Sequence, residues 1–259
     1  MQELTGIALN MPVFFLVLCR ASGIFLAAPV LSHNTVPTRV KVMLAVLLAL
    51  IMYPFASRYS GGLPGSVLAY VPLVIKELGL GLIMGFAASL VIAAVQSAGE
   101  MMAQQIGLTL SQVASPGFAD EEANQISVFL GILGLLLFLV VDGHHWFAEG
   151  LAVSFRDIPL GKVPVRPRAM GVMSREFSGM FINALRIAAP LIAIMFLANV
   201  SIAMMAKSVP QMNILMVGYP VKVLIGVVAM LLTFPLMWPV LRAAFVRLQG
   251  NLLNLSRLL

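Results

Sequence analysis

Residues 78–99 read LGLGLIMGFAASLVIAAVQSAG and contain no Asp, Glu, Lys or Arg. A helix needs about 20 apolar residues to cross the hydrocarbon core of a bilayer, and this stretch supplies them. The chain does not show the ten-residue alternation that is typical of a membrane β-barrel, and backbone groups in lipid must be hydrogen-bonded within the protein. The stretch therefore predicts a membrane-spanning α-helix.

Small residues line this predicted helix and should let a second helix approach it closely. Such contacts drive helix association in membranes, where water expulsion does not operate. We therefore expect this face to contact protein instead of lipid, and an obligate partner could cover it. The residues are Gly79, Gly81, Gly85, Ala87, Ala88, Ala93 and Ala94.

Five further stretches of similar character lie on either side. Together with residues 78–99 they predict an all-α integral membrane protein with about six hydrophobic segments, a single domain over residues 1–259. Prolines in and beside these stretches predict helices that kink or end early. The stretches are Leu4–Leu31, interrupted by Arg20, and Val42–Phe55, Ile126–Val141, Ile187–Ala206 and Val223–Leu241; the prolines are Pro12, Pro29, Pro54, Pro72, Pro190, Pro235 and Pro239.

The composition supports this class. Of the 259 residues, 61% are hydrophobic and only 10% are charged, whereas ordinary soluble domains carry about 25% charged residues. A water-soluble monomer is excluded, and the single Cys19 excludes an intrachain disulfide framework and the usual cysteine-based zinc sites. The net charge of +6 is scattered over short connections, which favours the positive-inside bias of a membrane protein over nucleic-acid binding.

Ionisable residues in or beside apolar spans are costly and are therefore functional candidates. His144 and His145 follow Asp142, and with Glu121 and Glu122 they raise the alternative of an intramembrane metal-dependent hydrolase. Adjacent side chains on a helix diverge by about 100°, so this spacing argues against a shared metal ion. The full set of candidates is Arg20, Glu100, Asp142, His144, His145, Arg186 and Lys222.

Motifs for catalysis or nucleotide binding are absent from the sequence. There is no phosphate-binding loop, dinucleotide fingerprint or nucleophile elbow. We therefore predict no catalytic residue, no cofactor and no metal. A self-contained small-solute transporter remains an alternative, since Pro12, Pro190 and Pro235 could break helices around a midplane site, but no clear inverted repeat is visible.

The connection between residues 99 and 125 is long, acidic and punctuated by glycine, yet it carries apolar residues that a free loop would not need. Long connections of this kind tend to be functional. Irregular backbone at membrane depth is tolerated only against protein or water. A re-entrant loop that lines or closes a pathway is therefore a physical possibility.

Several motifs, in this order along the chain, resemble the FliR family of flagellar export-gate proteins, which is related to a component of virulence type III secretion injectisomes. Each motif is weak alone, but their order and spacing over the whole chain make the resemblance specific. The motifs are Val36-Pro37-Thr38-Arg39-Val40-Lys41, Ala98-Gly99-Glu100 with Gln105-Ile106-Gly107, Asp142-Gly143-His144-His145, Ser208-Val209-Pro210-Gln211-Met212-Asn213 and Gly218-Tyr219-Pro220-Val221-Lys222.

The resemblance implies a non-enzymatic subunit of the flagellar type III protein export gate in the bacterial inner membrane, at the flagellar basal body. Such proteins assemble with FliP and FliQ proteins, next to FlhB and FlhA proteins, into a gate that passes unfolded rod, hook and filament subunits. It also implies kinked helical hairpins, with a FliP-like part over residues 1–180 and a FliQ-like part over residues 181–259.

The resemblance further assigns residues 107–124 to a plug-like loop under the closed channel. It places the turn of the last hairpin, and the charged residues of the other motifs, against neighbouring subunits or at the cytoplasmic entrance. The predicted plug residues are Leu108, Leu110, Pro116, Gly117 and Phe118, and the predicted inter-subunit or entrance residues are Pro210, Gln211, Asn213, Lys222, Glu100, Arg39 and Lys41.

Overall fold

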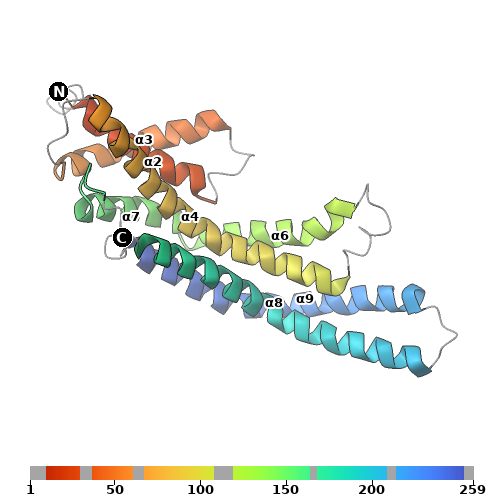
Figure 1. Ribbon diagram of the computed structural model, residues 1–259. Helices are drawn as coiled ribbons and strands as arrows, with labels where there is room; N and C mark the ends of the chain where they lie inside the picture. Colours follow the sequence, from red (N-terminus) through yellow and green to blue (C-terminus); the bar gives the residue numbers. More distant parts are fainter. Residues whose placement is uncertain are drawn as a thin grey trace. The chain divides into compact units, whose positions relative to one another are not determined.

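The computed structural model describes residues 10–29, 37–60, 67–107, 119–163, 168–208 and 214–253, and all the regular structure in these ranges is α-helical (Figure 1). This confirms the predicted all-α class. The helices are α2 (Met11–Ala27), α3 (Thr38–Ser57), α4 (Val67–Ile106), α6 (Ala119–Val140), α7 (Gly143–Asp157), α8 (Arg168–Ser208) and α9 (Ile214–Leu253).

Four of these helices, α3, α4, α8 and α9, are long and apolar enough to cross a membrane. The bent pair formed by α6 and α7 meets the same criterion when the two are taken together, and α2 is a shorter apolar helix. The protein is therefore an all-α membrane protein, as its composition predicts.

Three helices are much longer than the apolar stretches that predicted them. Helix α4 has 40 residues, α8 has 41 and α9 has 40. Apolar length marks only the part of a helix that avoids water, whereas Ser, Glu, Gln and Arg extend a helix without making it apolar. The predicted prolines at positions 54, 72, 190, 235 and 239, and Pro220 as well, lie inside helices that continue past them. Of the two expected effects, kinking or ending a helix, these prolines do not end their helices.

Helix α7 was not predicted, because residues 142–186 are too polar to count as a span. It is amphipathic: Phe147, Leu151 and Phe155 recur every four residues and are buried. This spacing places the three side chains on one face of the helix.

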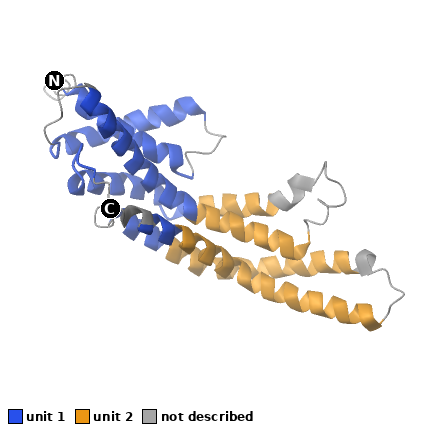
Figure 2. Cartoon of the chain, in the orientation of Figure 1, with its two compact units in different colours: residues 1–90, 138–176, 245–259 blue, residues 91–137, 177–244 orange. Residues whose placement is uncertain are grey.

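The described chain divides into two compact units (Figure 2). Unit 1 comprises residues 1–90, 138–176 and 245–259, and unit 2 comprises residues 91–137 and 177–244. Each unit is thus built from separate pieces of chain. The division into parts at residue 180 that the resemblance implies stays a prediction.

Unit 1 packs α2 against α3 and the N-terminal half of α4, and α3 also contacts α7. An aromatic cluster closes one part of its core. The ring of Phe138 lies 5.7 Å from that of Phe245, 5.9 Å from that of Trp146 and 6.0 Å from that of Phe147.

Unit 2 contains the C-terminal part of α4, most of α6, α8 from residue 177 to its C-terminal end and α9 from its N-terminal end to residue 244. A Cβ added at Gly226 of α9 would stand 2.6 Å from the side chain of Ile106 on α4. The rings of Phe129 on α6 and Phe234 on α9 meet edge to face at 6.2 Å. Apolar side chains thus join α4 and α6 to α9 in this unit.

Candidate functional site

A buried ion pair joins α2 to α4 in unit 1. The Arg20 Nε–H donates to Glu77 Oε2 across 2.6 Å, and both side chains are 0% exposed. Arg20 was a candidate from the sequence as a cation inside an apolar span, whereas Glu77 was not singled out. The signal was available, because a charge buried in an apolar segment requires a partner of opposite sign.

The pair also reaches the end of α7 and the turn that follows it. One terminal nitrogen of Arg20, Nη1, donates to the Ser154 hydroxyl at 3.1 Å, and both terminal nitrogens donate to the carbonyl oxygen of Ile158 at 3.2 Å. The other Glu77 oxygen, Oε1, accepts the Gly161 backbone N–H at 2.9 Å. Five groups from three parts of unit 1 are thus held together.

An aromatic ring completes this network. The guanidinium carbon of Arg20 lies 4.4 Å from the centre of the Phe155 ring, which is a favourable cation–π geometry. In the described part of the chain, every buried side-chain nitrogen and oxygen has a hydrogen-bond partner. The arrangement fixes α2, α4 and the end of α7 against one another.

Glycines allow the close approach on which this ion pair depends. A Cβ added at Gly81 would meet the backbone carbonyl oxygen of Arg20, and one added at Gly85 would lie 2.7 Å from the carbonyl oxygen of Ile24. The predicted small-residue face of α4 thus contacts protein, as expected at these two positions. The helix that covers Gly81 and Gly85 is α2 of the same chain, so no partner is needed there.

In unit 2, a smaller polar contact joins α4 to α6. The Ser127 hydroxyl donates to the Gln96 carbonyl oxygen at 3.1 Å and lies 3.5 Å from Glu100 Oε1. Gly99 faces Ser127 at the same crossing, and a Cβ there would come within 2.8 Å of the Ser127 Cα. Glu100, a predicted inter-subunit residue, lies on α4 beside this crossing and is exposed.

The other predicted site residues fall in several places. Arg39 and Lys41 lie in the first turn of α3 in unit 1, whereas Lys222 is half-buried on α9 in unit 2. The described candidates therefore belong to both units. Predicted residues outside the described ranges are Leu108, Leu110, Pro116, Gly117, Phe118, Pro210, Gln211 and Asn213.

The predicted plug boundary needs one correction. Helix α6 begins at Ala119, so the last part of the predicted loop over residues 107–124 is helical.

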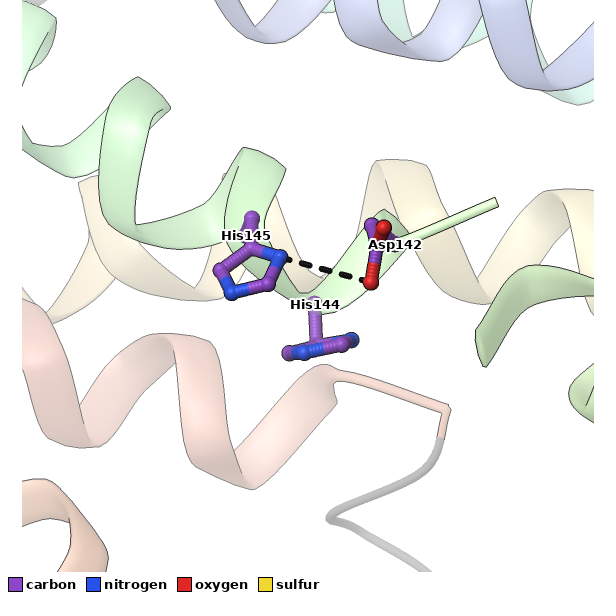
Figure 3. Close-up of side chains that lie close together, drawn as sticks. All are labelled: Asp142, His144 and His145. Carbon is purple, nitrogen blue, oxygen red and sulfur yellow. Dashed lines mark ion pairs between the residues drawn. The ribbon is translucent and has the colours of Figure 1, made fainter. Parts of the chain in front are cut away.

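Asp142, His144 and His145 come together where α6 gives way to α7 (Figure 3). The two imidazole rings lie 4.1 Å apart between centres, and His145 Nδ1 lies 3.6 Å from Asp142 Oδ1. Although side chains of adjacent helical residues diverge by about 100°, these two rings lie close together, and the prediction of no metal is not tested by this proximity. Both rings are exposed in the first turn of α7, where rotation about the side-chain bonds brings them together although their Cα–Cβ bonds diverge.

Comparison with known proteins gives a consistent result. The family described as "Bacterial export proteins, family 1" matches residues 11–248. Three similar proteins each carry the name flagellar biosynthetic protein FliR. The protein from Pectobacterium carotovorum is 31% identical, and the alignment covers 87% of this chain and 85% of the relative. The protein from Escherichia coli K12 is 29% identical, with 88% of this chain and 86% of the relative covered. The protein from Bacillus subtilis 168 is 29% identical, with 94% of this chain and 95% of the relative covered.

Proposed function

This chain belongs to the bacterial export proteins, family 1, and on that premise we propose that it is a structural and gating subunit of the flagellar protein export gate. It aligns with proteins named FliR over most of their length, so it is a component of the flagellar export apparatus. The family is one of structural export components and not a known enzyme family. The match over residues 11–248 is the observation that carries the proposal.

The proposed gate is formed with FliP and FliQ proteins in the bacterial inner membrane at the flagellar basal body, next to FlhB and FlhA proteins. Unfolded rod, hook and filament subunits would pass through it. The exposed apolar side chains of α8 and α9 support an assembled state, because many large hydrophobic residues there are left uncovered by the chain itself. In the assembly, lipid and partner subunits would share this surface.

Within this gate, residues 108–118 are proposed to close the channel. They join the C-terminal part of α4 to α6, and this part of α4 and most of α6 belong to unit 2. Pro210, Gln211 and Asn213 join α8 to α9 and are proposed to face neighbouring subunits at the entrance, with Lys222, Glu100, Arg39 and Lys41 as further contacts.

The plug is tested by replacing residues 108–118 with a Gly/Ser linker of equal length. In cells that also produce the FliP and FliQ partners, we expect the assembled gate to become leaky to small ions, which is measured as loss of membrane potential. A matched control replaces residues 61–66, which join α3 to α4 in unit 1, with a Gly/Ser linker.

Co-purification of the three proteins establishes that each variant assembles. The control should assemble and remain impermeable to small ions. Unchanged permeability in an assembled gate that lacks residues 108–118 would contradict the plug. Failure of the wild-type chain to co-purify with these partners would contradict the gate itself.

A further inference from the structure

The side chains of Asp142, His144 and His145 offer three ligand atoms that all lie within 4.8 Å of one another. Ligands of a tetrahedral zinc ion stand about 3.3 Å apart, given bond lengths near 2.0–2.1 Å. The three side chains are exposed, so we expect rotation among their rotamers to close that difference. Two imidazoles and one carboxylate suit zinc and its late-transition-metal neighbours better than magnesium or calcium, which prefer oxygen ligands.

The Asp142 carboxylate is available for a ligand because it does not cap the helix. Asp142 occupies the N-cap position of α7, yet its side chain accepts no capping hydrogen bond. Its backbone is left-handed, with φ 56° and ψ 31°, a conformation that Asp tolerates better than most residues. The carboxylate instead points toward His145, and both side chains are about 70% exposed, with values of 69% and 70% (Figure 3).

We propose that Asp142, His144 and His145 bind one divalent ion of the zinc class, with water in the remaining coordination position. The positive end of the α7 dipole opposes a cation here, and the negative carboxylate of Asp142 offsets it. The ion would tie Asp142, at the break after α6, to the first turn of α7. It would thereby hold the left-handed conformation that separates the two helices.

The experiment uses the full-length chain, purified in detergent without a histidine tag and titrated with Co²⁺ alone. Visible absorption reports the coordination of the ion, and competition with Zn²⁺ gives the zinc affinity. We expect one ion per chain. His144→Ala and His145→Ala should each weaken binding at least tenfold, since even the loss of a residue behind a metal ligand typically costs about 10–100-fold.

Two further variants make the result specific. Asp142→Asn keeps the side-chain shape and the tolerance for a left-handed backbone, so a loss of affinity in it reports the carboxylate charge. His33→Ala removes the third histidine of the chain and should bind as wild type does. Circular dichroism and elution volume confirm that each variant is folded.

Three outcomes would overturn the site. The first is an absence of saturable binding in the wild-type chain. The second is a metal affinity in the His144→Ala/His145→Ala double variant equal to that of wild type. The third is a loss of affinity in His33→Ala as large as the loss in His144→Ala or His145→Ala. These readouts do not depend on assembly into an export gate.

Discussion

The helices inside unit 1 and the helices inside unit 2 are joined by different kinds of contact. In unit 1, directional polar groups join the helices: Arg20 and Glu77 pair in the core without any exposure, and the half-buried Asn251 donates to Glu176 across 2.8 Å. In unit 2, the packing is mainly apolar, and only 22% of the most apolar window of α9 is buried.

The difference teaches how each unit obtains a single structure. A buried ion pair tolerates only one register between α2 and α4, because any shift leaves a charge without its partner. Apolar helices, by contrast, can slide or rotate at small cost unless lipid or another subunit covers them. The contacts inside unit 1 therefore fix the register of its helices, whereas the helices of unit 2 are suited to be covered by lipid or another subunit.

The largest loss of stability is expected when the ion pair of unit 1 is broken. Arg20→Met leaves the Glu77 carboxylate buried without a cation, and we expect it to lower the free energy of unfolding by about 3–5 kcal/mol. The double variant Arg20→Met/Glu77→Met removes both charges and should lose less, although the Ile158 carbonyl and the Gly161 N–H then lack their partners. Denaturant or thermal unfolding in detergent measures both.

The matched control for this test is Arg39→Met, because Arg39 is exposed and surface substitutions usually stay within about 0.5 kcal/mol. A double variant no more stable than Arg20→Met would show that the pair does not act as a unit.

An intermediate effect is expected where α2 and α4 approach each other. The Cβ of Gly81→Ala would collide with backbone atoms of Arg20 and Gly23, which cannot move aside as a flexible side chain can. We expect a loss of about 1–3 kcal/mol in unfolding free energy. Gly79→Ala is the matched control, because a Cβ there has nothing within 4 Å and Ala gains up to about 1 kcal/mol over Gly inside a helix. Equal stability of the two variants would mean that the helices are not in close contact.

The smallest effect on stability is expected on the exposed face of unit 2. Leu231 on α9 is 62% exposed, so Leu231→Ala should change the unfolding free energy of the isolated chain by no more than about 0.5 kcal/mol. The same variant should reduce co-purification of partner subunits if they cover this face.

The comparison variant for this surface is Leu241→Ala. Leu241 belongs to the same helix but is 1% exposed, and the substitution should cost about 2–5 kcal/mol. A large loss of stability in Leu231→Ala would show that the chain covers this face by itself.

The sequence predicts the fold class well and the individual helices less well. Residues 78–99 lie within α4 as predicted, because charge-free length alone identifies a helix that avoids water. The extension of α4 to Ile106 and the whole of α7 were missed, since their polar residues carry no such signal. Helix α7 could have been found from its four-residue recurrence of Phe147, Leu151 and Phe155.

The candidate sites show the same limit. Arg20 stands out in the sequence because a charge in an apolar stretch is rare, but its partners are 57 and 134 residues away, at Glu77 and Ser154. Only the tertiary structure reveals which distant groups satisfy it. His144 and His145 were identified as a pair, yet their convergence depends on side-chain rotation, which spacing along a helix does not predict.

The buried Arg20 also constrains how the chain is made. Helix α2 leaves the ribosome with a cation in its apolar middle, and the carboxylate that pairs with it in the folded chain, Glu77, does not exist until residue 77 has been synthesised. An arginine at the centre of an isolated membrane helix costs at least about 2.5–3.5 kcal/mol on insertion scales. We therefore expect α2 to reach its final position late in synthesis, after α4 and then α7 have been made.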